Sequence, residues 1–300
     1  MLSKKISNRT IEYKHQLKNW LVDTNLLPNQ QNYQKFVIVC GIRTGSTMLC
    51  SLLSKHSQTL MFFELFHHHL ESIPFHAPGY RAKSQDKRIV DLRNSDPVEF
   101  LKTEIYKPHP QKIQAVGFKL IYTQGRTDNP WWNSSDFDRW WKDVGRPPSW
   151  SSTKSDLWSY LKENTDIAII HMRRKNLLQR IVSTFTAQAT GNWGVGATGG
   201  LGDNKKEVKF DLNFDECRQD FEAIRKMEDE ADEFFANHKK LVIAYEDLIE
   251  NMTNTTNNIE EFLGLEIKKL NTETKKQATK LPSEMITNYQ QLKEQFSGTP

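Results

Sequence analysis

The sequence predicts an α/β fold in which a doubly wound, mainly parallel sheet is flanked by helices. Short apolar runs that are typical of buried strands recur along the chain, and helical patterns separate several of them. Strands that alternate with helices favour a parallel sheet with helices on both faces. The predicted strands cover 36–40, 60–63, 115–122, 167–172 and 241–245.

Apolar periodicity and end signals predict helices between and after these strands. The predicted helices cover 47–55, 96–105, 154–163, 176–190, 214–237 and 254–263. Gly264 is expected to close the last of them, because glycine readily adopts the left-handed conformation that ends a helix.

We expect one domain over 1–300. Residues 1–35 are expected to form a peripheral N-terminal helix ahead of the first core strand. Segment 123–155 is rich in Trp and polar residues, and we interpret it as an insertion over the functional site. Segment 191–203 contains six glycines and is interpreted as a loop.

Composition excludes several classes of function. The 41 Lys and Arg residues nearly balance 37 Asp and Glu residues, and the net charge of +4 is no signature of a nucleic-acid-binding protein. The three cysteines lack metal-ligand spacing, which favours a reduced, cytoplasmic protein. No stretch approaches the 18 or so apolar residues of a membrane span, and the N-terminus has no signal-peptide core. We therefore expect a cytoplasmic protein that does not span a membrane.

The most informative motif is the run 41–47, which joins the first core strand to an amphipathic helix. Backbone N–H groups at a helix N-terminus suit a phosphate or sulfate, and Gly45 allows a ligand to approach closely. The Ser46 and Thr47 hydroxyls add donors, and Arg43 adds positive charge. The alternative is a helix N-cap without a ligand.

The Walker A loop needs two glycines five apart followed by Lys and Ser/Thr, whereas Gly41 and Gly45 are four apart and no lysine follows. This disfavours an ATP or GTP hydrolase. The turn instead resembles the 5′-phosphosulfate loop of sulfotransferases that use 3′-phosphoadenosine 5′-phosphosulfate (PAPS). The resemblance implies that the donor is bound by Arg43, Thr44, Gly45, Ser46 and Thr47.

A second motif lies where the strand 167–172 meets the next helix, with cations at 173–175. In open α/β sheets ligands bind at this edge. Ser183 falls two turns later on roughly the same face, so an Arg and this Ser could share one phosphate. The pair resembles the 3′-phosphate motif of sulfotransferases, with Arg173 as first choice and Arg174 as second; a basic cap without a ligand is the alternative.

Two further segments carry the resemblance. The runs 241–248 and 259–265 are similar to the Tyr-Glu-Asp-Leu and Phe-Leu-Gly-Leu segments of the family, in which the tyrosine lies near the nucleotide. Tyr245 is therefore a candidate for binding or for packing alone. The C-terminal region resembles the tail of bacterial Nod-factor-type sulfotransferases, in which a basic segment folds over the nucleotide. This implies contacts from Lys275, Lys276 and Gln277, with a solvated charge run as the alternative.

Transfer to a hydroxyl needs a base within hydrogen-bond reach of the acceptor oxygen. Glu64 follows the apolar run 60–63, and burial there would raise its pKa and make it a better base. It matches the Glu that carbohydrate-type and bacterial sulfotransferases carry after this strand. The cytosolic small-molecule branch uses a His two residues after a strand Lys, where this chain has Lys119 and Ile121. A structural ion pair is the alternative role for Glu64.

Three consecutive histidines, 67–69, point in different directions on either a helix or a strand and are poorly placed to share one metal. We predict no metal. His67 is a candidate to bind the acceptor, or to act as the base instead of Glu64. Lys119 either reaches the transferring group or extends along the strand to solvent.

The resemblance implies a PAPS-dependent sulfotransferase that moves a sulfuryl group to a hydroxyl, most simply on a carbohydrate or glycolipid, and releases adenosine 3′,5′-bisphosphate (PAP). Arg43 and Glu64 would be catalytic, with no metal and no nucleic acid involved. A nucleotide-dependent phosphotransferase or kinase is the alternative enzyme. The alternative from another class is a non-catalytic nucleotide-binding interaction module. The sequence leaves the acceptor and the oligomeric state open.

Overall fold

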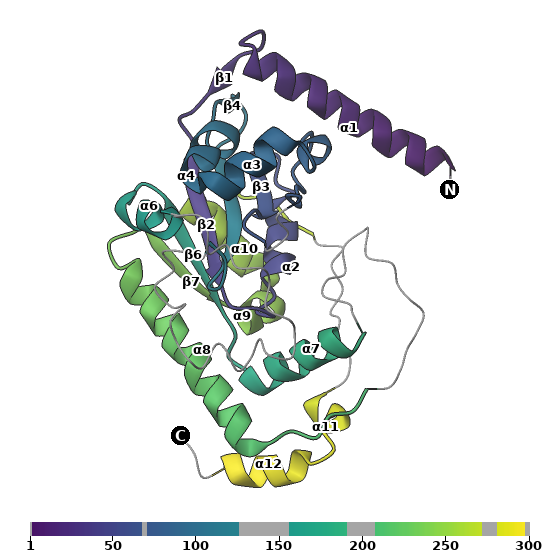
Figure 1. Cartoon of the computed structure of the whole chain (residues 1–300), viewed down its shortest axis with the longest axis vertical. Coiled ribbons are helices and arrows are strands. Elements are labelled where there is room, and N and C mark those ends of the chain that lie inside the picture. Colours follow the sequence, from purple (N-terminus) through teal and green to yellow (C-terminus); the bar gives the residue numbers. More distant parts are fainter. Residues whose placement is uncertain (1, 68–70, 126–155, 191–207, 272–280, 298–300) are drawn as a thin grey trace.

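The core of the molecule is a five-stranded parallel sheet with strand order β3-β5-β2-β6-β7 (Figure 1). The computed structural model describes residues 2–67, 71–125, 156–190, 208–271 and 281–297. The strands are β2 (Gln34–Cys40), β3 (Thr59–Glu64), β5 (Ala115–Ile121), β6 (Ala168–Arg173) and β7 (Lys240–Ala244). All five predicted strands are confirmed to within a few residues.

Helices cover both faces of the sheet, because side chains of successive strand residues point to opposite sides. In β2, Phe36, Ile38 and Cys40 join one apolar cluster, whereas Val37 and Val39 join the other. The first cluster is covered by α2 (Ser46–Leu53), α9 (Tyr245–Glu250) and α10 (Met252–Leu263). The second is covered by α3 (Lys87–Ser95), α4 (Pro97–Phe100), α6 (Leu157–Glu163) and α8 (Phe214–Phe234). The doubly wound arrangement is thereby confirmed.

The chain leaves the middle of the sheet in two directions. After β2 it passes through α2 to β3 at one edge, and after β6 it continues to β7 at the other. Strands β2 and β6 are neighbours, with Cys40 opposite Met172. Their carboxyl ends therefore meet where the winding direction reverses, which is the place where ligands bind in open α/β sheets.

A third apolar cluster lies beyond this edge of the sheet (Figure 1). It joins α7 (Leu177–Thr190) to the beginning of α8 and to the C-terminal helices α11 (Pro282–Met285) and α12 (Tyr289–Phe296). The buried residues that α7 contributes to it are Ile181 and Val182. The cluster thus fixes α7, which follows β6, next to the ligand-binding edge.

The helix predictions differ from the structure mainly in short elements. The predicted helix 96–105 is α4 followed by a π-helical turn, η2 (Leu101–Ile105). The sequence reasoning missed α3, which begins where Asp86 caps the backbone N–H of Ile89. It also missed α9, α11, α12, the 3₁₀ turn η1 (Arg81–Lys83) and the two-residue strands β1 (Asn29–Gln30) and β4 (His109–Pro110). Gly264 ends α10 with φ 69°, as predicted.

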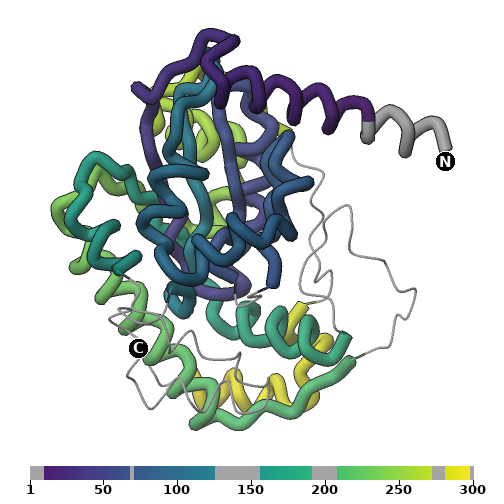
Figure 2. Tube along the Cα trace, turned by 45° about the horizontal axis from the view of Figure 1, so that its top comes forward, coloured from purple at the N-terminus to yellow at the C-terminus, as the bar shows by residue number. Residues whose placement is uncertain are grey.

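The N-terminal helix α1 spans Leu2–Asp23, within the expected segment 1–35. Its carboxyl end lies near β1 and β4, and the coloured part of the helix runs outward from there (Figure 2). None of the described helices combines the length and apolar character needed to cross a bilayer. The predicted insertion falls almost entirely on 126–155, and the glycine-rich loop on 191–207, both outside the described residues.

Candidate active site

The turn between β2 and α2 has a backbone built for a closely approaching ligand. Arg43 and Gly45 both adopt left-handed conformations, with φ of 59° and 80°. For a non-glycine residue such as Arg43 this conformation costs on the order of 1 kcal/mol. The Thr44 hydroxyl donates to the Gly41 carbonyl over 3.0 Å and closes the turn. Helix α2 begins directly afterwards, so its first N–H groups, which have no intrahelical partner, face this turn.

Ser183 and Arg174 reach the same turn from α7 and the end of β6. Both Nε and Nη2 of Arg43 donate to Ser183 Oγ, over 3.0 and 2.9 Å. Arg174 Nη1 donates to the Arg43 carbonyl oxygen over 2.8 Å. The two motifs found separately in the sequence are therefore parts of one site, which we call the cradle: residues 41–47 together with Arg174 and Ser183.

Tyr245, the first residue of α9, holds two parts of the cradle together. The Arg174 guanidinium lies over its ring, 4.7 Å from the centroid. A Cβ atom on Gly45 would lie 2.2 Å from Tyr245 Cδ2, so the ring can occupy this place only beside a glycine. Tyr245 therefore packs against both Gly45 and Arg174, and its contact with a nucleotide stays a prediction.

The cradle is strongly electropositive. Burial lowers the pKa of Arg43, and the nearby Arg174 lowers it further. Burial likewise lowers the pKa of Arg174. Arg174 Nε is buried and makes no hydrogen bond to another described residue, while the nearest carboxylate oxygen, on Glu246, is 3.9 Å away. An anion in the cradle would relieve the repulsion between the guanidinium groups and supply the missing acceptor.

The structure places Arg174, the second choice from the sequence, at the cradle and Arg173 away from it. Arg173, favoured by the sequence, turns to α8, where it pairs with Asp232 and donates to the Glu228 carbonyl over 3.1 Å. Asp232 also pairs with His171 over 2.9 Å and Lys240 over 3.0 Å. Successive residues of β6 face opposite sides of the sheet, and Arg173 lies on the side of α8. Arg174, on the side of α2 and α9, is the arginine at the cradle.

Glu64 is placed by an irregularity at the end of β3. The pairing of β3 with β5 shifts register between Met61 and Glu64, and Phe63 has φ 60°. Bulges of this kind redirect a side chain. As a result Glu64 lies opposite Lys119 of β5.

Glu64 and Lys119 form a partly buried ion pair next to the cradle. Lys119 Nζ lies 2.5 Å from Glu64 Oε1 and donates to Thr47 Oγ1 over 3.2 Å. Gln124 Nε2 donates to Glu64 Oε2 over 2.9 Å. The Lys119 side chain is only 3% exposed, so it does not extend to solvent. Lys119 therefore connects the candidate base to the cradle.

Burial acts to raise the pKa of Glu64, as expected. The charge and hydrogen bond of Lys119 outweigh it, however, and the pKa of Glu64 lies below its ordinary value of 4.5. Conversely, burial opposes the charge on Lys119, but the attraction of Glu64 outweighs it and raises the lysine's pKa. Glu64 is therefore ionised at neutral pH and can accept a proton, but with modest proton affinity.

Two histidines lie near the ion pair. His67 is close enough to contribute to the lowered pKa of Glu64. His76, which the sequence reasoning did not consider, packs its ring 4.6 Å from that of Phe63. Burial, followed by the charges of Arg81 and Lys119, lowers the pKa of His76 and favours its neutral form.

Several sequence candidates fall outside the described residues. These are His68, His69, Lys275, Lys276 and Gln277. The sequence reasoning also missed Gln124, which carries no motif and could be found only from the folded position of the residues after β5. Within the described ranges, no three side chains of His, Cys, Asp or Glu are arranged to hold a metal ion.

Comparison with known proteins decides the family. The sequence model named "Sulfotransferase family" matches residues 35–269, well over half of the chain. The chain belongs to the sulfotransferase family. The match includes the cradle of this sulfotransferase together with Glu64 and Lys119, and it supports sulfotransferase activity.

Solved sulfotransferases resemble the structure at low sequence identity. One is a sulfotransferase from Alicyclobacillus acidocaldarius, 13% identical, with 88% of this chain and 91% of that chain covered and a TM-score of 0.42. Another is a mouse sulfotransferase complexed with PAP, 12% identical, with 85% of this chain and 67% of that chain covered and a TM-score of 0.36. No sequence among the curated proteins matches this sulfotransferase.

The ion pair gives a prediction for stability. Lys119→Met removes one partner of a buried pair and should lower the free energy of unfolding at neutral pH by about 3 kcal/mol. The lower end of the range for such pairs applies because the Glu64 side chain keeps 22% of its surface exposed. Urea denaturation measures the difference, with the exposed Lys112→Met as matched control.

The same variant should show a definite pH dependence. The pKa of folded Glu64 is lowered, so its contribution is complete above the unfolded value of 4.5 and is lost as pH falls through the folded value. In Lys119→Met, burial acts on Glu64 without the opposing charge of the lysine, and protonation stabilises the folded state. The difference in the free energy of unfolding between the native protein and Lys119→Met should therefore become smaller below about pH 4.5. No difference at neutral pH, or a difference that stays constant as the pH falls below about 4.5, would contradict the ion pair.

Proposed function

We propose that this sulfotransferase moves the sulfuryl group of PAPS to a hydroxyl group of an acceptor, either a carbohydrate or a glycolipid. The single observation that carries the proposal is the convergence of Arg43, Arg174 and Ser183 on one turn. One buried and one half-buried guanidinium group and a helix N-terminus at one place fit a ligand with more than one anionic group.

The residues of the cradle fit the two ends of such a donor. The turn 43–47 would hold the 5′-phosphosulfate, since the first N–H groups of α2 face this turn and Arg43 supplies charge. Arg174 and Ser183 would hold the 3′-phosphate, for which the buried Nε of Arg174, without a hydrogen bond to another described residue, is a suitable donor. Arg173 would support the site from behind through Asp232. Lys275, Lys276 and Gln277 remain proposed contacts to the nucleotide.

When bound, PAPS would supply the sulfuryl group and leave as PAP. The S–O bond to the 5′-phosphate breaks as the acceptor oxygen forms a new bond to sulfur. Glu64 would take the proton of the acceptor hydroxyl, because each of its oxygens keeps a free lone pair beside its hydrogen bond. Arg43 and Lys119 would stabilise the negative charge that develops on the departing phosphate and the transferring group.

The acceptor side is less closely defined. His67 and Lys119 lie close to Glu64 and are proposed to contact the acceptor. His76, whose lowered pKa favours the neutral form, is a further candidate to hydrogen-bond to the acceptor. A carbohydrate or glycolipid is favoured by the resemblance of Glu64 to the base of carbohydrate-type and bacterial members.

Transfer from radiolabelled PAPS to a panel of saccharides, glycolipids and small alcohols tests the reaction. Glu64→Gln should reduce the rate at least a hundredfold, as expected for a positioned base, while PAP still binds. The exposed Glu163→Gln serves as the matched control. Because the pKa of Glu64 is lowered, the native rate should not fall through titration of Glu64 between about pH 5 and 7. PAP binding without transfer to any acceptor would instead favour a non-catalytic nucleotide-binding module.

The two neighbouring arginines provide a sharper test of the nucleotide site. Arg174→Ala should weaken PAP binding roughly 10- to 100-fold, since a charge-assisted hydrogen bond contributes about 1.5 to 3 kcal/mol, and should change AMP binding much less. Arg173→Ala should lower stability while preserving the preference for PAP over AMP. Calorimetric titration of both variants measures this difference. Loss of the preference in Arg173→Ala alone would refute the assignment.

A further inference from the structure

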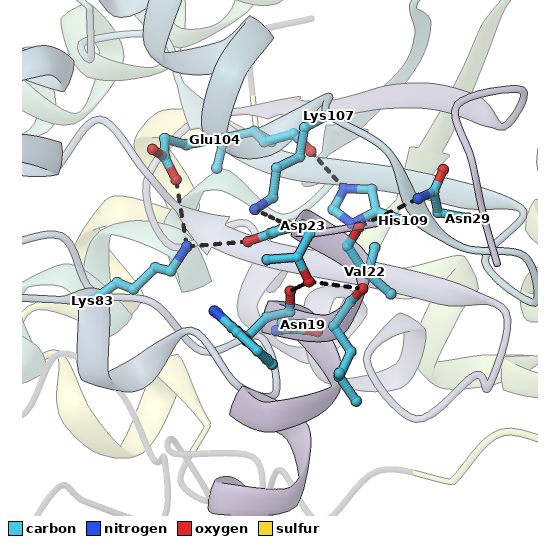
Figure 3. A network of polar contacts seen from close by, with 12 residues as sticks. Asn19, Val22, Asp23, Asn29, Lys83, Glu104, Lys107 and His109 are labelled. Atoms are coloured by element: carbon cyan, nitrogen blue, oxygen red, sulfur yellow. Dashed lines mark hydrogen bonds and ion pairs between the residues drawn. The ribbon is translucent and has the colours of Figure 1, made fainter. Parts of the chain in front are cut away.

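The N-terminal helix α1 is fixed to the body of the protein at its carboxyl end. Figure 3 shows Asp23 facing two lysines from the body. Lys107 Nζ lies 2.5 Å and Lys83 Nζ 3.9 Å from its carboxylate. Asn19 donates to the Pro78 carbonyl over 3.3 Å, and Val22 is buried. These contacts define which side of α1 faces the protein and therefore which side faces outward.

The outward side carries large apolar groups. Tyr13, Leu17 and Trp20 are 67%, 47% and 55% exposed. Their spacing of four and three residues places them on one stripe of the helix, which we call the α1 stripe. Isolated exposed apolar residues need no explanation. Three on the same side of one helix indicate a surface that a membrane or another molecule covers.

The charge around the stripe is positive. The sequence of α1 contains five Lys and Arg residues, at 4, 5, 9, 14 and 18, against two acidic residues, Glu12 and Asp23. Asp23 is neutralised by lysines of the body. Lys14 and Lys18, within one turn of Leu17, form no ion pair with any other described residue. The outward side of α1 therefore complements a negatively charged partner.

The charge and the size of the stripe decide between partners. A second copy of this chain would bring its own basic helix against the first, which is electrostatically unfavourable. The stripe is also small: three half-exposed side chains offer on the order of 300 Å², whereas a stable protein interface needs about 800 Å² per partner. Binding to a lipid surface does not need an interface of this size, because the free energies of apolar insertion and of attraction to anionic headgroups add to each other.

We infer that α1 binds the protein to the surface of an anionic lipid membrane. The α1 stripe enters the boundary between headgroups and acyl chains, where Trp and Tyr are favourable. Lys14 and Lys18 contact the lipid phosphates. The inference is independent of the proposed reaction, because it concerns a surface that is not part of the cradle.

Vesicle cosedimentation of the full chain tests the inference. Native protein should bind vesicles of phosphatidylcholine that contain phosphatidylglycerol, more weakly at high salt, and should bind pure phosphatidylcholine little. Lys14→Gln/Lys18→Gln should weaken binding roughly thirtyfold, at about fivefold per lysine. Tyr13→Ser/Leu17→Ser/Trp20→Ser should weaken it at least tenfold. A blue shift of fluorescence on vesicle binding that is lost in Trp20→Phe would locate the inserted residue.

Matched variants at exposed positions elsewhere serve as controls. Ile267→Ser removes an exposed aliphatic group outside α1, and Lys226→Gln/Lys269→Gln removes two exposed charges. These should bind vesicles as the native protein does, and circular dichroism checks that every variant is folded. Absence of binding to anionic vesicles, or equal binding by the stripe variant, overturns the inference. A dimer that the stripe variant abolishes, without vesicle binding, overturns it in favour of a second copy.

Discussion

Two arginines, Arg174 buried and Arg43 half-buried, meet at the carboxyl edge of the sheet and are the feature on which the site depends. Arg174 donates to the backbone of Arg43 over 2.8 Å, and burial lowers the pKa of both side chains. This arrangement costs folding free energy, because like charges are brought together out of water. An anion binding there would recover it. The positions of β2 and β6, where the winding of the sheet reverses, make the contact possible.

The second half of the site depends on the first through Lys119. This lysine joins Thr47 of the cradle to Glu64, and so connects the proposed place of the departing group to the proposed base. Its charge keeps Glu64 ionised despite burial. As the proposed base, Glu64 would be ready to accept a proton at neutral pH, and its reactivity would rest on position more than on proton affinity.

Much of the fold and the cradle could be predicted because the signals are local. The runs 36–40 and 167–172 are typical of buried strands, and a glycine-rich basic turn before a helix is an anion site in many folds. The choice between Arg173 and Arg174 was not local. That choice requires knowing which face of β6 is covered by α2. Because side chains alternate between the two faces along a strand, this face then decides which arginine points toward the cradle. The pKa of Glu64 likewise depended on Lys119, which is 55 positions away along the chain. Short elements such as α3 depend on single caps that sequence patterns rarely reveal.

The central claim is that one site on this sulfotransferase recognises both phosphates of a 3′-phosphorylated adenosine nucleotide. Thermal unfolding of the native protein with PAP, AMP or ATP at equal concentration tests it directly, since a ligand at about a hundredfold its Kd stabilises the folded state by about 2.7 kcal/mol. The account predicts that PAP raises the melting temperature by several degrees more than AMP or ATP. Equal shifts with PAP and AMP, or a larger shift with ATP, would contradict it.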